Sequence, residues 1–287
     1  MKGMVCQGTL KANATFVGEG IHFGQTTKMV IHPAPPGYGI RFLRTDADGA
    51  KPVRVSANSI KSHTFSTTIG NGAFVVSTVE HLMSAFYPMG IDNALVELDG
   101  PEVPIFDGSA APFVYMISGI GTKKFARPRQ FLKIKKPVEI YDEDRFIAAY
   151  PSDKLEISYT IEFSNDVVKR QTLELVVTPE TYSREIARAR TFGFLKDVDE
   201  LKNNGFAKGG SLNRVVLVNG HTILNREGLR YPDEFVRHKA LDLVGDIALL
   251  GYPLLAKVVV YKGGHGLHHQ LVREIASRRG VKELVTF

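Results

Sequence analysis

Strand-like and helix-like segments come in blocks along this sequence, and their order limits the folds open to the chain. β-rich stretches bounded by Gly or Pro occur at residues 27–32, 39–43, 94–98, 133–140, 146–150, 155–163 and 257–261. Apolar residues at helical spacing occur at residues 77–89, 112–120, 234–250 and 267–279. Crossover helices do not regularly separate the strands, which argues against a doubly wound parallel sheet. We predict an α+β fold with mainly antiparallel sheets.

Both halves of the chain contain this mixture of strands and helices. With 287 residues the chain exceeds the usual size of one domain. Each half has a run of strands and two helices, which predicts two α+β domains of similar architecture. The basic, Pro-containing stretch at residues 123–129 (KKFARPR) is expected to link them. We place the domains at residues 1–126 and 127–287.

Composition narrows the functional classes. The net charge is +6, but no block of five like charges occurs, so nucleic acid is not an expected partner. Cys6 is the only cysteine, which excludes an intrachain disulfide and a Cys-rich metal site and suits the cytoplasm. The N-terminus does not resemble a signal peptide, and no apolar run reaches the roughly 20 residues of a membrane helix. We expect a cytoplasmic protein without a transmembrane segment.

The helix predicted at residues 234–250 carries the first candidate metal ligands. His238 and Asp242 are four residues apart, so they share one helix face, and Asp246 extends that face by a turn. A neutral imidazole and a carboxylate at this spacing can ligate one zinc ion. The surrounding residues are apolar, so part of the helix is buried and its polar groups need partners.

Glu80 and His81 form the second candidate pair. In hydrolytic zinc sites one such group binds the metal, and its neighbour removes a proton from the metal-bound water. A structural explanation competes for Glu80. Ser77 and Glu80 have the spacing of a capping box at the start of the helix at residues 77–89. This segment alone leaves both interpretations open.

His265 lies among glycines in the segment KGGHGLHH (262–269), where the backbone can turn tightly and leave the imidazole accessible. Such a histidine suits general acid catalysis, and Asp246 is a candidate to orient it. His268 and His269 start the following helix and are expected on the solvated surface. Thr191, in ARTFGF (189–194), offers a hydroxyl for a developing oxyanion, although alone it is typical of a strand end.

Together these segments closely resemble UDP-3-O-acyl-N-acetylglucosamine deacetylase, the zinc enzyme of lipid A synthesis in Gram-negative bacteria. The resemblance covers nearly the whole chain. Its motifs are GEGIHFG (18–24), STVEHLMSAF (77–86), GIDNALVELDGPEVPIFDGSA (90–110), ARTFGF (189–194), GGSL (209–212), EGLRYPDEFVRHKALDLVGD (227–246) and KGGHGLHH (262–269). The sequence departs from the usual family pattern at Phe23 and at His268-His269.

The resemblance implies a two-domain α+β fold with the active site between the domains. It implies one catalytic Zn²⁺ held by His81, His238 and Asp242. It implies Glu80 as general base, His265 as general acid supported by Asp246, and Thr191 as oxyanion stabiliser. It places Lys239 at the substrate diphosphate and Phe192 near the glucosamine. It implies an acyl passage after Phe194, with Leu195, Val198, Ala207 and Val216 as apolar candidates and Gly210 and Ser211 at its wall. We also assign Phe194 and Lys262 to the substrate site.

The reaction implied by the resemblance is hydrolysis of the N-acetyl group of UDP-3-O-acyl-N-acetylglucosamine with release of acetate. This is an early committed step of lipid A (lipopolysaccharide) biosynthesis, and we expect the enzyme to be a monomer. Two other functions stay open. One is a different zinc amidohydrolase such as a peptidase. The other is a basic nucleic-acid-binding module with a structural zinc, which requires a fourth ligand that the sequence does not offer at metal-site spacing.

Overall fold

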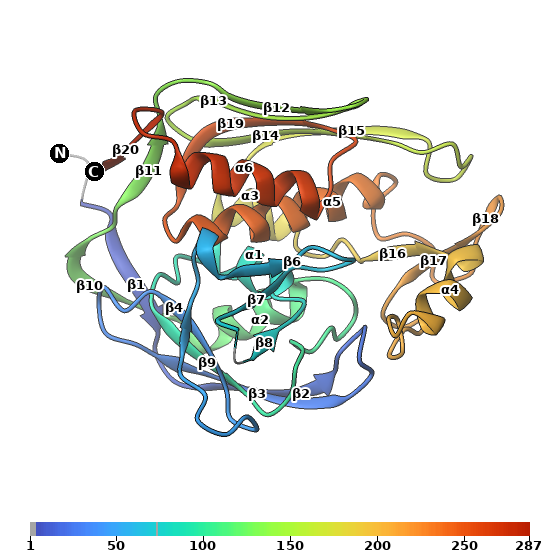
Figure 1. The fold of residues 1–287 in the computed structure, drawn as a ribbon, viewed down its shortest axis with the longest axis horizontal. Helices are drawn as coiled ribbons and strands as arrows, with labels where there is room; N and C mark the ends of the chain where they lie inside the picture. Colours follow the sequence, from blue (N-terminus) through green and yellow to red (C-terminus); the bar gives the residue numbers. More distant parts are fainter. Residues whose placement is uncertain (1–3, 73) are drawn as a thin grey trace.

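The computed structural model describes residues 4–72 and 74–287, which form four layers (Figure 1). A sheet from each half of the chain forms an outer layer. Between them pack helices α1 (Glu80–Met89) and α2 (Ala111–Ile120) from the first half, and α5 (Glu234–Ile247) and α6 (His265–Ser277) from the second. These four helices lie where apolar periodicity predicted them, and the α+β class is confirmed.

The sheet of the first half has five strands. They are β2 (Ala14–Glu19), β3 (Thr26–Pro33), β4 (Ile40–Arg44), β5 (Val53–Arg54) and β9 (Ala94–Leu98). Their order is β2-β3-β9-β4-β5, and only β4 and β9 pair in parallel. Buried residues alternate with less buried ones along β3 and β9, as expected for a sheet with one face on the core.

The sheet of the second half has seven strands. They are β11 (Phe131–Ile134), β12 (Val138–Asp142), β13 (Arg145–Pro151), β14 (Leu155–Glu162), β15 (Arg170–Val176), β19 (Leu254–Tyr261) and β20 (Lys282–Val285). Strand β19 pairs antiparallel with β13 and in parallel with β11 and β14. The single strand predicted at residues 133–140 is wrong. The chain there leaves β11 and enters β12 around Pro137, which lacks the N–H that a continuous strand needs.

Shorter elements complete the fold. They are β1 (Cys6–Leu10), β6 (Ile60–Ser62), β7 (Thr68–Gly70), β8 (Val75–Val76), β10 (Thr122–Pro128), α3 (Pro179–Glu185), β16 (Phe192–Phe194), α4 (Val198–Asn203), β17 (Val216–Asn219), β18 (Thr222–Ile223) and the 3-10 turns Ala57–Ser59, Leu195–Asp197 and Ala248–Leu250. Strands β16, β17 and β18 form a small sheet that projects with α4 from one side of the molecule (Figure 1). None of the described helices is long and apolar enough to cross a membrane.

The segment expected to link the two halves is itself a strand. Residues 122–128 form β10, which pairs antiparallel with β1 from the start of the chain. The connection is therefore tied into a two-stranded sheet, because its backbone groups find partners in β1. The division into domains at residues 126 and 127 stays a prediction.

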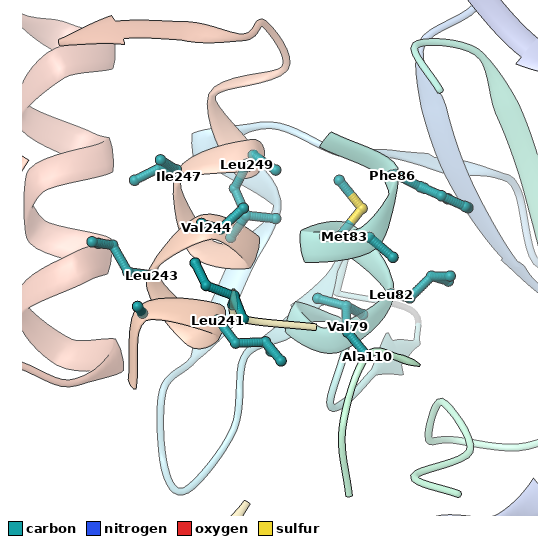
Figure 2. Close-up of a cluster of buried hydrophobic side chains, with 14 of the residues drawn as sticks. Val79, Leu82, Met83, Phe86, Ala110, Leu241, Leu243, Val244, Ile247 and Leu249 are labelled. Carbon is teal, nitrogen blue, oxygen red and sulfur yellow. The ribbon is translucent and has the colours of Figure 1, made fainter. Parts of the chain in front are cut away.

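Helices α1 and α5 pack against each other in the centre of the molecule. Figure 2 shows Met83 on α1 facing Val244 on α5, with Val79 and Leu241 nearby in the same buried cluster. The helices approach each other closely at Gly245, where an added Cβ would lie 2.1 Å from the backbone oxygen of Glu80. Glycine is the residue that permits such a close backbone approach. This packing brings the polar start of α1 beside the polar face of α5.

Candidate active site

Glu80 and His81 lie in the first turn of α1 and are buried. Of the two interpretations left open for Glu80, the capping box with Ser77 is wrong. The residue at the N-cap is Val79, no side chain caps the helix, and Ser77 is held outside it by backbone hydrogen bonds. The Glu80 carboxylate instead accepts a hydrogen bond from the backbone N–H of Thr67, at 3.1 Å.

The backbone just before α1 is strained. Thr78 has φ +59°, a left-handed conformation that is rare for a β-branched residue. Its hydroxyl donates a hydrogen bond of 2.8 Å to the buried carboxylate of Glu102. Glu102 also accepts the backbone N–H groups of His22 and Phe23. The start of α1 is therefore fixed to the loop of the GEGIHFG motif.

His81, His238 and Asp242 meet where α1 and α5 come together. One side-chain donor atom of each lies within 4.8 Å of the other two, and all three residues are buried. The Asp242 Oδ1 atom lies 3.3 Å from His238 Nε2 and 3.7 Å from His81 Nε2. Two imidazole nitrogens and a carboxylate oxygen that converge in this way can hold a metal ion.

The charge states of these groups suit a metal. Burial lowers the pKa of His81 to about 3 and also lowers the pKa of His238, so both imidazoles are neutral. The pKa of Asp242 is lowered although burial opposes this, because positive charge on His238 or on Lys239 favours its charged form. With His238 neutral, the Lys239 ammonium, 2.9 Å from Asp242 Oδ2, supplies that charge. The Nδ1 atom of His238 lies 3.1 Å from the carbonyl oxygen of Ala189, which leaves Nε2 free to coordinate.

Behind this group lies a second polar cluster around Asp246. His265 Nδ1 and His268 Nδ1 lie 2.7 and 2.8 Å from Asp246 Oδ2. His269 Nε2 lies 3.5 Å from Asp246 Oδ1. The expected solvated positions of His268 and His269 are therefore wrong, since both are fully buried. They face the core because the first turn of α6 packs toward α5, which presents the Asp246 carboxylate as their partner.

Asp246, His265 and His269 also satisfy the distance criterion for a metal site. The nitrogen and oxygen atoms that would bind a metal, however, already form short hydrogen bonds with one another and with Thr67. In the first group, by contrast, the same kinds of atoms face one another at 3.3 and 3.7 Å. We therefore regard the Asp246 cluster as a hydrogen-bonded network and the first group as the candidate metal centre.

Glu80 and His265 face each other between the two clusters. His265 Nε2 lies 3.8 Å from Glu80 Oε1 and 3.8 Å from Asp242 Oδ2. Burial raises the pKa of Glu80 to about 8. The pKa of His265 is raised to about 9, against the effect of burial, mainly by Asp246. Two groups with pKa values near neutrality beside a metal-binding group are typical of an acid–base pair.

A largely apolar pocket of about 380 Å³ opens beside Glu80 and His81. It contains eight of the residues expected at the substrate or oxyanion site, namely Thr191, Phe192, Phe194, Leu195, Val198, Ala207, Gly210 and Ser211. Val216 does not line it, and this prediction is wrong. Side chains alternate along β17, so the neighbouring Val215 and Leu217 line the pocket while Val216 points into the core.

Two lysines expected at the substrate lie outside this lining. The Lys239 ammonium is 2.9 Å from Asp242 Oδ2, so it sits at the candidate metal centre. The Lys262 ammonium is 2.8 Å from Asp144 and borders a separate surface pocket of about 230 Å³.

Sequence reasoning missed Thr67, which contacts both clusters, because no motif or periodicity marks an isolated threonine.

Comparison with known proteins gives relatives that match nearly the whole chain. A relative from Myxococcus xanthus (strain DK1622), named UDP-3-O-acyl-N-acetylglucosamine deacetylase, is 46% identical over 281 residues, covering 97% of this chain and 89% of the relative. Relatives of the same name from Geobacter sp. (strain M21) and Phenylobacterium zucineum (strain HLK1) are 45% and 43% identical. The alignment with the Geobacter relative covers 99% of this chain and 93% of that relative. The alignment with the Phenylobacterium relative covers 98% and 97%.

A family profile gives the same result along most of the sequence. The profile described as "LpxC: UDP-3-O-acyl N-acetylglycosamine deacetylase" matches residues 7–277, a range that includes every residue of both polar clusters and of the pocket. The chain therefore belongs to the LpxC family of UDP-3-O-acyl N-acetylglycosamine deacetylases.

Proposed function

We propose that this protein hydrolyses the acetamide of UDP-3-O-acyl-N-acetylglucosamine and releases acetate, as a step of lipid A biosynthesis. The names of its relatives support this substrate. The observation that carries the proposal is the junction of three features in one place. A His-His-Asp metal-binding group, the Glu80–His265 pair and an apolar pocket that can accept an acyl chain all adjoin one another.

We propose zinc as the metal and His81, His238 and Asp242 as its ligands. Catalytic zinc sites characteristically use three nitrogen or oxygen ligands of this kind. When bound, zinc lowers the pKa of a water molecule and polarises a carbonyl oxygen. A structural zinc site needs four protein ligands, and this group contains three among the described residues, which favours the hydrolase over a zinc-stabilised binding module.

The residues of this chain supply the proton transfers and the binding. Glu80 accepts a proton from the attacking water, and His265 donates one to the amine that leaves the tetrahedral intermediate. Asp246 orients the His265 ring through its hydrogen bond to Nδ1. Thr191 lines the pocket together with Glu80. Its hydroxyl donates to the developing oxyanion.

We also propose which residues contact the substrate, on the basis of the family and of the pocket beside the candidate metal centre. The acyl chain occupies the apolar pocket between Phe194 and Ser211. Phe192, whose ring centroid lies 6.4 Å from that of His238, borders the glucosamine. The ammonium groups of Lys239 and Lys262 bind the diphosphate, which is anionic and attracts such point charges.

A zinc measurement combined with a deacetylation assay tests the proposal. We expect one zinc per chain and acetate release from the UDP-acyl-sugar, with no cleavage of peptides. His81→Ala, His238→Ala and Asp242→Ala should each lose both zinc and activity. Full zinc content in all three variants would show that the ligands are wrong, and peptide cleavage without acetate release would favour a peptidase.

A further inference from the structure

Thr67 lies between the two polar clusters and is completely buried. It immediately precedes strand β7 and uses three of its polar atoms to bind the surrounding elements. Its backbone N–H donates to Glu80 Oε2, and its carbonyl oxygen accepts the N–H of Val79 at 3.3 Å. Its hydroxyl bonds Asp246 Oδ1. One residue thus contacts the start of α1 and the polar face of α5.

The hydrogen-bond pattern determines which way the Thr67 hydroxyl points. Burial opposes the charged form of Asp246, but its pKa is well below its usual range because His265 and His269 favour that form, so this carboxylate only accepts. Thr67 must therefore donate to Asp246. It then accepts from the N–H of His269, whose Nε2 lies 2.8 Å from the hydroxyl oxygen.

The other oxygen of Asp246 accepts from His265 Nδ1 and His268 Nδ1. Tyr159 lies 3.0 Å from His268 Nε2, and its hydroxyl is the donor there because Nδ1 holds the ring proton. The donors that bond Asp246, the Thr67 hydroxyl and His268 Nε2 therefore each have an assigned acceptor. The arrangement leaves His265 Nε2 directed toward Glu80.

We propose that Thr67 is a positioning residue for this reaction, which holds the Glu80 carboxylate and the Asp246–His265 pair in a fixed relative place. The inference rests on the proposed function. Two protein groups that exchange protons with one substrate require defined separations, and small displacements are costly in rate. Thr67 is suited to this task because its backbone holds one group and its hydroxyl holds the other.

Three variants separate the hydroxyl from the fold. Thr67→Val has nearly the same shape without the hydroxyl, Thr67→Ser keeps the hydroxyl, and Thr68→Val removes a neighbouring hydroxyl that bonds Ser77 instead. We expect Thr67→Val to lower kcat about 10-fold or more, the equivalent of one hydrogen bond to a charged group. KM and zinc content should stay unchanged. Thr67→Ser and Thr68→Val should keep kcat within about 3-fold of the unaltered enzyme.

Several outcomes would overturn the proposal. These are a normal kcat in Thr67→Val, an equal loss in Thr68→Val, or a loss in Thr67→Ser as large as that in Thr67→Val. If Thr67→Val does not fold, Thr67→Ala is judged by the same criterion. Combined with Asp246→Asn, Thr67→Val should cost little more than Asp246→Asn alone, because both changes act through one carboxylate. Fully additive losses would contradict this.

A spectroscopic measurement keeps the positioning role distinct from the proposed function. The proton on His265 Nδ1 should give a downfield NMR resonance that Thr67→Ser preserves and Thr67→Val shifts. An unaltered enzyme that fails to release acetate would refute the proposed function. In that case an unchanged resonance in Thr67→Val would refute the positioning role separately.

Discussion

Glu80 and His265 lie 3.8 Å apart, and their surroundings push both toward the protonated form. Burial keeps the metal-free Glu80 carboxyl neutral near pH 7, because its pKa is about 8, and Asp246 keeps His265 charged. A bound cation would favour the carboxylate form of Glu80. In the proposed function, metal binding would therefore turn this pair into a base beside an acid, which is the combination that amide hydrolysis needs.

Neutral replacements of either group should stop turnover without removing the metal. We expect Glu80→Gln and His265→Gln to lower kcat about 100-fold or more, because each loses its proton transfer. Neither is a proposed ligand, so zinc content measured by elemental analysis should not change. His221→Gln, an exposed histidine paired with Asp166, serves as the control and should keep full activity. A Glu80→Gln enzyme with normal kcat would leave that residue without a catalytic role.

The same pKa values predict how the metal-free protein responds to pH. Both folded-state pKa values exceed the unfolded ones, so the folded chain binds more protons than the unfolded chain between pH 6.5 and 9. The contribution of His265 is full below pH 6.5 and is lost as pH rises toward 9. Glu80 becomes increasingly unfavourable as pH rises toward 8. We expect Tm of the metal-free protein to fall across this window.

Thermal unfolding of metal-free samples at several pH values measures this effect. Glu80→Gln cannot titrate, so its Tm should change less between pH 6.5 and 8 than that of the unaltered protein. A Tm that rises with pH over this range in the unaltered protein would show that the assigned protonation states are incorrect. Zinc-loaded samples serve as the comparison, because a ligand that binds only the folded state raises Tm.

At the scale of helices and strands, the sequence predicted the elements that have a clear hydrophobic period. It missed features that depend on contacts between distant parts of the chain. Helices α1 and α5 combine an apolar stripe with a polar motif, so both they and their Glu80, His81, His238 and Asp242 side chains could be placed from the sequence. The linker predicted at β10 is wrong because its Lys and Pro residues are depleted in strands in general, and pairing with β1 outweighs that preference.

Other incorrect predictions also concern features that the local sequence does not reveal. The prediction that His268 and His269 lie in solvent is wrong because nothing in their local sequence reveals the buried Asp246 carboxylate that α5 supplies. The elements from α3 to β18 are seven residues or shorter, which is too short for a period to appear. Val216 was misplaced by one residue, which in a strand moves the side chain to the opposite face.

The close contact of α1 and α5 at Gly245 predicts the effect of a single methyl group. In Gly245→Ala the new Cβ would lie 2.1 Å from the backbone oxygen of Glu80, so the helices must move apart. We expect a loss of about 1–3 kcal/mol in the free energy of unfolding, as for other overpacked cores. Zinc affinity should also fall, because the two helices carry different ligands. Chemical denaturation and zinc titration measure the two effects.

Gly119 on α2 provides a matched control. A Cβ added there meets nothing within 4 Å among the described residues. Gly119→Ala should therefore be neutral, or stabilising by up to about 1 kcal/mol, because alanine favours a helix. If Gly245→Ala were equally harmless, the close packing of α1 on α5 would not control the metal centre.

At the scale of the whole molecule, the pocket draws its wall from both halves of the chain. Ile21, His22 and Phe65 come from the first half, and the apolar side chains from β16, α4 and β17 come from the second. The candidate metal centre is likewise shared between α1 and α5. The layered packing of the two sheets and their helices is therefore what assembles the site, and neither half contains it alone.

The pocket predicts a dependence on acyl length that one substitution should remove. Val198 on α4 lines the pocket, and a larger side chain there takes part of the space proposed for the acyl chain. In Val198→Phe, each displaced methylene should cost about 0.8 kcal/mol, or roughly fourfold in kcat/KM for a long-acyl substrate. A short-acyl analogue does not reach this part of the pocket and should keep its kcat/KM, and zinc content should not change. Val17→Phe, on the exposed side of β2 and outside the pocket lining, is the control and should affect neither substrate. Equal losses for long and short substrates in Val198→Phe would mean that the substitution damages the fold, and the acyl chain would have to bind elsewhere.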